Sequence, residues 1–222
     1  MNLNKHLEFF NPLAIEDPIH IIGVGAIGSI LAENLVRIGL PKLNIYDFDI
    51  VESQNITNQL YLHKHIKQLK VEALEDILTE INPNIIVTKW HKGCTPDQHL
   101  TGHVFLCVDS IKTRQKITDK QLFNPYIKTM HDFRMRLTDA QYYAAQWKNH
   151  EQKQKFKKSM DFTSEEAKEA SPVNACGSTL SIAPTIRTIV ATGVANFING
   201  IQGKNFITGA MLDPFNNTYY TW

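Results

Sequence analysis

The chain has 222 residues, 43% of them hydrophobic, which is enough for one domain with a substantial core. Lysine and arginine total 23 against 22 aspartate and glutamate, and this balance argues against the basic stripe of a non-specific nucleic-acid binder. No apolar run reaches the roughly 20 residues of a membrane span, and the first residues lack a secretory signal, so we expect a cytoplasmic protein without a membrane partner. The cysteines, Cys94, Cys107 and Cys176, are too few and scattered for a disulfide framework or a C-x-x-C zinc site.

The segment IHIIGVGAIGS, residues 19–29, joins a short apolar run to three glycines. Gly23 suits a tight turn, Gly25 a close approach of the backbone to a phosphate, and Gly28 close packing of a helix on a strand. Apolar residues then recur at helical spacing until Gly39, which predicts a strand, a turn and an amphipathic helix. Because a helix N-terminus offers free N–H groups and a positive partial charge, the segment predicts a nucleotide-phosphate site.

The second predicted strand, LNIYDFD at residues 43–49, finishes on two acids. Asp47 has the spacing from the glycines, about 20 residues, at which a carboxylate accepts hydrogen bonds from ribose hydroxyls. The alternative is that Asp47 only caps a turn at the end of the strand. Asp49 and Glu52 either join the site or serve only to form that turn.

The first half of the chain alternates between strand and helix patterns. After an irregular or weakly helical stretch at 50–69, apolar residues at helical spacing over 71–81 precede the stop signal Asn82-Pro83. Residues 84–90 and 103–109 supply two further strands. This alternation predicts an α/β fold with a doubly wound, Rossmann-like, mainly parallel sheet.

The second half changes character. Residues 128–147 predict antiparallel strands, and the almost wholly polar stretch 148–171 predicts a solvated helix or a mobile crossover rather than a binding site. A long helix is predicted from Gly177, and a β-hairpin at a sheet edge over 205–222. We expect all of these elements to form a single domain over residues 1–222.

Several further side chains are candidates for chemistry. Asp109 follows a parallel strand at its carboxyl end, where ligands bind in such sheets. Lys70 opens a predicted helix and is either a functional cation or a plain exposed lysine. Cys176 precedes a helix whose dipole would stabilise a thiolate, so it is either a nucleophile or a small half-buried thiol. Cys107 lies in an apolar strand and is expected in the core, and Cys94 has no evident partner.

The motifs form an ordered series along the chain. YDFDIVESQNITNQ holds an acid-x-acid pair, V-E and S-x-N, and a lysine then opens a helix that ends in I-N-P. LCVDSIKTR, NACGSTLSIAPTIRTIVATGVANF and LDPFNNTYY follow. Together these motifs resemble the ThiF/MoeB/HesA superfamily, the prokaryotic relatives of ubiquitin-activating enzymes, over residues 19–222 except for the polar insert. Phage- and plasmid-borne members, including the ThiF-like proteins of PRTRC systems, look closest.

This resemblance implies an enzyme that uses ATP and Mg²⁺ to adenylate the C-terminal glycine of a small ubiquitin-like or sulfur-carrier protein, as a homodimer. It implies nucleotide contacts by Gly23, Gly25, Gly28, Asp47 and Asp49. It implies phosphate contacts by Asn55, Asn58 and Lys70. It also implies magnesium binding by Asp109 and a covalent step at Cys176.

The sequence departs from the family pattern at cationic positions. Asn58 stands where the family has a phosphate-binding arginine, and residues 1–18 contain no match for the arginine that relatives supply across the dimer. The C-x-x-C pairs of many relatives are also absent. An amide carries no charge, so stabilisation of the β- and γ-phosphates should be weaker unless Lys5, Arg37, Arg114 or a partner compensates.

Two other functions stay open on the sequence. A non-catalytic nucleotide-sensing or docking protein of the same fold would explain the missing arginines. A nicotinamide-dependent oxidoreductase would share the glycine turn, although no separate substrate domain or hydride-transfer constellation is evident.

Overall fold

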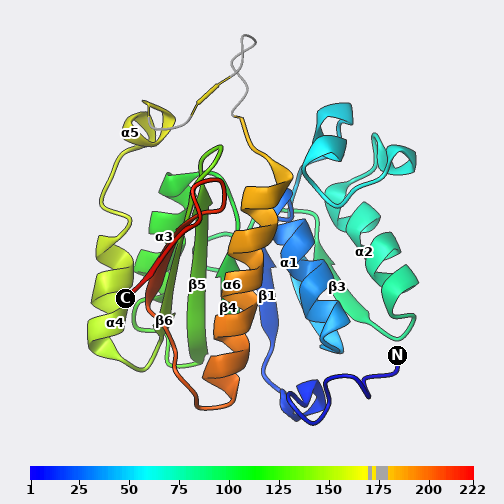
Figure 1. Ribbon diagram of the computed structural model, residues 1–222, viewed down its shortest axis with the longest axis horizontal. Helices are drawn as coiled ribbons and strands as arrows, with labels where there is room; N and C mark the ends of the chain where they lie inside the picture. The colour runs from blue at the N-terminus through cyan, green and yellow to red at the C-terminus, as the bar shows by residue number, and fades with distance from the viewer. Residues whose placement is uncertain (170–171, 174–179) are drawn as a thin grey trace.

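A central sheet organises the computed structural model, which describes residues 1–169, 172–173 and 180–222 (Figure 1). Its eight strands lie in the order β3-β2-β1-β4-β5-β6-β7-β8. They are β1 (Ile19–Ile22), β2 (Lys42–Tyr46), β3 (Ile86–Trp90), β4 (Gly102–Leu106), β5 (Ile127–Met135), β6 (Ala140–Gln146), β7 (Gly209–Asp213) and β8 (Thr218–Thr221). Strands β1 to β5 pair in parallel, and β5 to β8 pair antiparallel. The expected Rossmann-like sheet with antiparallel C-terminal strands is confirmed.

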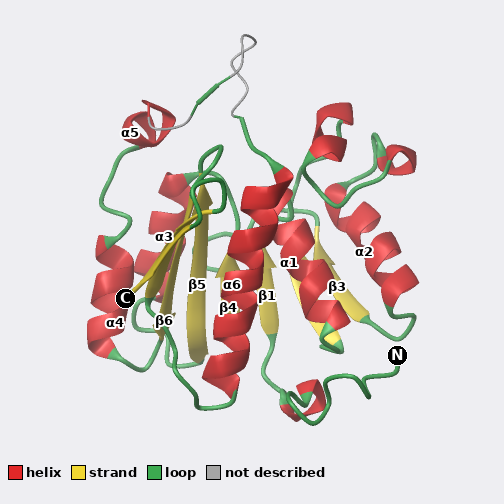
Figure 2. Ribbon diagram, in the orientation of Figure 1, coloured by secondary structure: helices red, strands yellow, loops and turns green. Residues whose placement is uncertain are grey.

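Helices cover both faces of the sheet (Figure 2). They are α1 (Ala26–Arg37), α2 (Lys70–Ile81), α3 (Ile111–Gln121), α4 (His150–Lys158), α5 (Ser164–Glu169) and α6 (Ala183–Ile201), with short 3-10 helices η1 (Pro12–Ala14), η2 (Ser53–Thr57) and η3 (His63–His65). The buried side chains of α1, α2 and α6 share one core cluster, and those of α3 and α4 share another. Because both faces are covered, β1 and β4 are buried along their whole length, as in other parallel sheets.

Two predicted strands end earlier than expected. β2 stops at Tyr46, and β4 stops at Leu106. Beyond β2, Asp47 Oδ1 accepts a hydrogen bond from the Asp49 N–H (2.9 Å), and such a local bond competes with sheet pairing. The acidic side chains that follow both strands therefore lie past the sheet, at its carboxyl edge.

The helix predicted from Gly177 begins later in the described part of the chain. Gly177 itself lies outside the described residues, and α6 starts at Ala183, preceded by Ile182 in an extended conformation. Pro184 occupies the first turn, the one helical position where a missing N–H costs no hydrogen bond. The proline therefore marks the start of the helix.

The helix α3 has no counterpart among the predicted elements. Its buried face mixes Ile111 and Ile117 with the polar residues Arg114, Thr118 and Gln121. Hydrophobic spacing cannot reveal such a face, because three of its five buried positions do not count as apolar.

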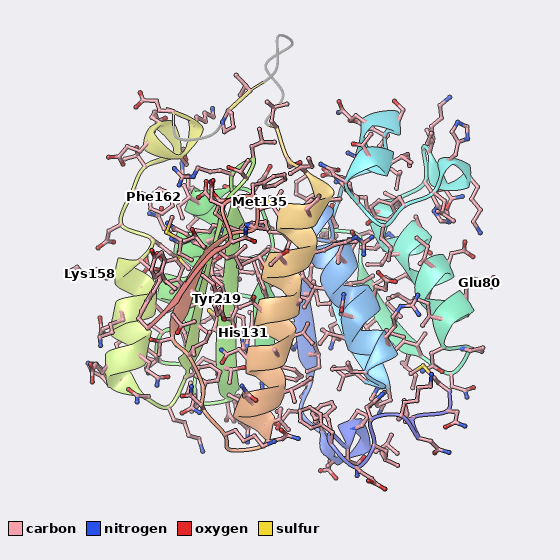
Figure 3. The ribbon with its side chains drawn as sticks, viewed as in Figure 1. Glu80, His131, Met135, Lys158, Phe162 and Tyr219 are labelled. Carbon is pink, nitrogen blue, oxygen red and sulfur yellow. The ribbon has the colours of Figure 1, made fainter. Side chains whose placement is uncertain are left out.

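The polar stretch 148–171 forms α4 and α5 where it is described. Phe156, at 2% exposure, anchors α4 by packing edge-on against Trp147, with the ring centroids 5.8 Å apart. Gln115 Nε2 also donates to the backbone oxygen of Met160 (2.7 Å), just after α4, and Phe162 lies on the connection toward α5 (Figure 3). The helix alternative is therefore correct for α4.

A chain of polar side chains runs through the core and includes His131, which packs edge-on against Phe197 of α6 (His131 is labelled in Figure 3). His131 bonds to the Tyr142 hydroxyl through Nδ1 (2.6 Å) and to the Thr129 hydroxyl through Nε2 (2.8 Å), and Thr129 in turn bonds to His103 Nδ1 (2.8 Å). Burial lowers the pKa of His103 to about 4 and the pKa of His131 well below its usual value. Burial likewise lowers the pKa of His20, on β1, to about 4. The native fold thus keeps these imidazoles neutral.

These histidines make the fold sensitive to acid. A histidine in the unfolded chain has a pKa near 6.5. As the pH falls from about 6.5 toward 4, these histidines therefore bind protons in the unfolded chain but not in the folded chain. We expect the free energy of unfolding to be highest above pH 7 and to fall by about 1.4 kcal/mol per pH unit for each such histidine. Urea unfolding of the wild type and of His103→Asn between pH 7 and 5 measures this effect. In the variant, the slope of the unfolding free energy against pH should correspond to about one proton fewer than in the wild type. An unchanged slope would contradict the conclusion that His103 stays neutral in the folded chain.

Candidate functional site

The glycine turn between β1 and α1 is the centre of the candidate site. Gly23 has φ +88°, and a Cβ there would lie 2.9 Å from the backbone nitrogen of Val108. A Cβ at Gly28 would lie 1.9 Å from the Gly23 carbonyl oxygen, so α1 rests directly on the turn. A Cβ at Gly25, by contrast, would lie 4.0 Å from Gln59 Nε2, its nearest neighbour among residues 1–169, 172–173 and 180–222. Two of the glycines are thus required by packing, while Gly25 borders open space.

The open space faces the N-terminus of α1. Gly25 is the N-cap residue and has no side chain with which to cap the helix, and the first turn of α1 contains no acid. The first N–H groups of a helix lack partners within the helix, and together with the helix dipole they attract anions. A cradle that a Cβ would fill, at an uncapped helix N-terminus, fits a phosphate group.

Asp47 fixes the turn to the neighbouring strand. Its Oδ2 accepts a hydrogen bond from the Val24 N–H (2.8 Å), and its Oδ1 accepts one from the Asp49 N–H. Burial raises the pKa of Asp47, although these two backbone bonds and the Lys70 charge oppose the rise. The turn-capping alternative is therefore part of what Asp47 does, and each oxygen keeps a second lone pair that a hydroxyl group can use.

The segment 59–61 holds the turn from outside. The Tyr61 hydroxyl donates to the Val24 carbonyl oxygen (2.6 Å), and the Leu60 N–H donates to Ser29 Oγ (3.1 Å). No pattern in the sequence singles out these two residues, because an aromatic and an aliphatic residue in an irregular stretch indicate only burial. Their contacts come from tertiary structure alone.

Lys70 reaches the same edge from the start of α2. It is only 7% exposed, its Nζ donates to Asp49 Oδ2 (2.7 Å), and its backbone N–H donates to the Asp49 carbonyl oxygen (2.9 Å). The alternative of a plain exposed lysine is wrong. The Lys70 ammonium is buried, but its partner Asp49 is half-exposed, so a phosphate at this edge could interact with the ammonium as well.

Asp109 lies exposed beyond β4, on a loop that Arg114 holds in place. The Arg114 guanidinium donates to the carbonyl oxygens of Val108 and Phe133 and to the fully buried carboxylate of Asp132. Arg114 is only 5% exposed, and its guanidinium is engaged with Asp132 and with the backbone of this loop. Arg114 therefore holds the loop that carries Asp109.

The other cations considered as replacements lie at the far edge. Arg37 is in the last turn of α1, a helix of 12 residues, so at 1.5 Å per residue it is about 16 Å from the glycine turn. Lys5 belongs to the N-terminal segment, whose Leu3 packs against Gly39 just after that helix. Arg37 and the segment of Lys5 thus lie away from the carboxyl edge, whereas Lys70 brings its charge to that edge.

The side chains of both asparagines of the motif are engaged in hydrogen bonds within the fold, Asn55 locally and Asn58 with a distant segment. Asn55 Oδ1 accepts a hydrogen bond from the Glu52 N–H (2.9 Å), which closes the first turn of η2. Asn58 Nδ2 donates to Ser181 Oγ, and the Asn58 Oδ1 atom is buried without a hydrogen-bond partner in the described part of the chain. Both asparagines lie next to the segment that holds the turn.

Neither of the described cysteines has the surroundings of a nucleophile. Cys107 packs against the core, as predicted, and burial raises the pKa of its thiol. Burial also raises the pKa of Cys94 to about 12. A reactive thiol needs the opposite shift. Cys176, the candidate nucleophile, lies outside the described residues.

Comparison with known proteins identifies the family. The sequence model of the ThiF family matches residues 16–219. The chain belongs to the ThiF family. Ubiquitin-like modifier-activating enzyme 5 of Caenorhabditis elegans is 30% identical over 119 residues, which cover 46% of this chain but only 28% of that relative. This ThiF-family chain therefore spans less than a third of that relative's length.

Solved structures share the fold of this ThiF-family protein. Escherichia coli MccB, solved with ATP, superposes with a TM-score of 0.69 at 14% identity, covering 93% of this chain and 63% of MccB. The E. coli tRNA N6-threonylcarbamoyladenosine dehydratase TcdA superposes with a TM-score of 0.64 at 17% identity, covering 90% of this chain and 94% of TcdA. At these identities the likeness establishes the fold.

Two negative findings concern the described residues. No group of three or more histidine, cysteine, aspartate or glutamate residues is arranged to hold a metal ion over residues 1–169, 172–173 and 180–222. In the same ranges, no helix has both the length and the apolar character needed to cross a bilayer.

The glycines of this ThiF-family protein allow a matched pair of variants. Gly28→Ala should cost about 3 kcal/mol or more, because the new methyl group overlaps the Gly23 carbonyl. Gly25→Ala should stay within about 1 kcal/mol of wild type yet weaken ATP binding at least about tenfold, because its methyl group fills the cradle. Thermal unfolding and titration calorimetry measure the two effects. Wild-type stability of Gly28→Ala, or wild-type ATP affinity of Gly25→Ala, would refute this geometry.

Proposed function

We propose that this protein adenylates the C-terminal carboxylate of a small protein or peptide with ATP. The observation that carries the proposal is the open cradle at Gly25, at an uncapped helix N-terminus and on the same sheet edge as buried Lys70 and exposed Asp109. The MccB structure with ATP and the name of the curated relatives support the same chemistry. Membership of the ThiF family disfavours the nicotinamide alternative for this glycine turn.

The reaction needs charge neutralisation and orientation rather than proton transfer. A carboxylate oxygen attacks the α-phosphorus of ATP, a new P–O bond forms, and the bond to pyrophosphate breaks, which leaves an acyl adenylate and pyrophosphate. The carboxylate is already deprotonated at neutral pH, so no general base is required. Fixed donors that match the phosphate charge then supply most of the acceleration. Here these donors are the first-turn N–H groups of α1 and the Lys70 ammonium.

The residues present also fit a magnesium ion brought by the nucleotide. Mg²⁺ is usually held by one or two carboxylates together with phosphate oxygens and water, and not by a complete protein cage. Asp109, exposed on a loop fixed by Arg114, is the carboxylate that would hold it. When bound, the ion would neutralise phosphate charge as the carboxylate approaches.

The shortage of cations makes outside help necessary in this proposal. Lys70 pairs with Asp49 and its charge also acts on Asp47, Asp109 lies exposed beyond β4, and Asn58 adds no charge. We propose that Mg²⁺ and a second copy of the chain, in a homodimer, supply the further positive charge that the phosphates need. Activity should therefore depend steeply on magnesium.

The substrate in this proposal is a small ubiquitin-like or sulfur-carrier protein that ends in glycine. The relatives' name, ubiquitin-like modifier-activating enzyme, supports a protein substrate, and MccB has been solved together with MccA. Transfer of the activated carboxylate to Cys176 would follow adenylation as a separate step.

A non-catalytic docking protein is the second candidate. It is favoured by the engagement of Asn58 with Ser181 and by the excess of acids over cations around the cradle. Such a protein would bind ATP without exchanging pyrophosphate for any carrier.

The test of adenylation is pyrophosphate exchange with ATP, magnesium and a carrier protein ending in glycine. Lys70→Met should lower kcat/KM about 100-fold or more, because the phosphates lose their cation at this edge. Lys64→Met is the matched control, since Lys64 is exposed and pairs with Asp76 away from the turn. Equal exchange by both variants would exclude Lys70 from the reaction. ATP binding without exchange in the wild type would favour the docking protein.

The covalent step has its own test. Cys176→Ala should leave pyrophosphate exchange at the wild-type rate but abolish any thiol-sensitive adduct between the chain and the carrier, because adenylation precedes thiol attack. Gel electrophoresis with and without reductant detects the adduct. Persistence of the adduct in Cys176→Ala would assign it to another residue.

A further inference from the structure

We propose that Asn58 is a positioning residue that ties the glycine turn to the start of helix α6 through its hydrogen bond to Ser181. The contact joins two parts of the chain that are 123 residues apart. Its kinetic consequence rests on the proposed function, whereas its structural consequence does not. The role differs from a phosphate contact, because the bonding partner of the amide is a side chain of the fold.

The start of α6 needs support from outside. Its N-cap residue, Ile182, offers no side-chain hydrogen bond to the first turn, a task that serine, threonine, asparagine and aspartate usually perform. The fold supplies other bonds there. The buried Thr185 hydroxyl donates to the Leu137 carbonyl oxygen (2.9 Å), and Ser181, directly before the N-cap, accepts from Asn58. The longest helix of the described chain is thus fixed at its start by tertiary hydrogen bonds.

The other end of the tether leads to the glycine turn. Asn58 is the C-cap residue of η2, and the next residues along the chain contact the turn. Leu60 bonds to Ser29 in the first turn of α1, and Tyr61 bonds to the Val24 carbonyl oxygen. Since α1 and α6 also pack against each other, the three contacts link both helices to one short strip of chain, residues 58–61.

The chemistry of the pair makes the tether robust. A serine hydroxyl both donates and accepts, so it bonds to the Asn58 side chain whichever way the amide is turned. The Asn58 Oδ1 atom is buried and lacks a partner among the described residues, so breaking the bond to Ser181 would leave the whole amide unsatisfied. Asn58 is only partly buried, but leaving its amide without a partner still costs free energy, and this cost favours the bonded position.

Hydrogen exchange of the backbone amides of residues 186–190, in the second turn of α6, tests the tether without any enzymatic assay. Asn58→Ala and Ser181→Ala should each raise exchange there about tenfold, and the double variant should show no further increase, because both remove the same bond. Thr57→Ala is the matched control: the Thr57 hydroxyl donates to the Gln54 carbonyl oxygen (3.0 Å) within η2 and does not contact α6. It should leave this exchange at the wild-type rate.

A conservative variant separates tethering from charge. In Asn58→Asp the Ser181 hydroxyl donates to the new carboxylate, so amide protection at the start of α6 should be retained. The added negative charge should raise the KM for ATP in pyrophosphate exchange. Asn58→Ala and Ser181→Ala should instead lower kcat to the same extent, with KM for ATP within about twofold of wild type.

Two results would overturn the tether. One is wild-type amide protection in Ser181→Ala, and the other is additive effects of the two alanine variants on exchange. A loss of pyrophosphate exchange in Asn58→Ala alone, with Ser181→Ala fully active, would assign Asn58 to the phosphates instead. If the wild type catalyses no pyrophosphate exchange, the proposed function fails, while the hydrogen-exchange result still decides the tether.

Discussion

The contact between α1 and the turn beneath it is the constraint on which the rest of the site depends. With hydrogen at the Cα of Gly28, the helix can rest on the Gly23 carbonyl, and its N-terminus then points over the ends of β1 and β4. Everything else at this edge secures that arrangement: Asp47 holds Val24 from one side, and Tyr61 holds it from the other. The helix dipole, a weak and short-ranged source of charge, becomes useful because it is aimed by packing.

The charge balance of the site follows from where the arginines of the chain lie. Arg114 is buried as a structural cation, and Arg37 lies in the last turn of α1, away from the cradle. Lys70, which lies at this edge, already shares its charge with Asp49. A polyphosphate in this cradle would therefore be held chiefly by neutral backbone donors. Such a site recognises shape well, but it needs added cations to favour a transition state.

Much of this arrangement could be predicted from the sequence, because its elements are local. The glycines, Asp47, Lys70 and Asp109 each follow a strand or open a helix, and parallel strands bring such positions to one edge. Helix α3 escaped prediction since its buried face is largely polar, and Tyr61 escaped since its role is a tertiary contact. Apolar spacing does not locate the start of α6, because it extends N-terminal to Pro184 and includes Ile182, which is extended and precedes the helix.

The buried pair of Arg114 and Asp132 has a consequence for the history of this fold. Asp132 also pairs with Arg134 (2.6 Å), so loss of Asp132 would leave the buried Arg114 charge uncompensated, whereas loss of Arg114 would leave Asp132 with one cation. Substitution of Asp132 should therefore be tolerated only together with substitution of Arg114. Arg114 also holds the carbonyl of Val108, so a lineage that gives up the pair must find another way to shape the loop of Asp109.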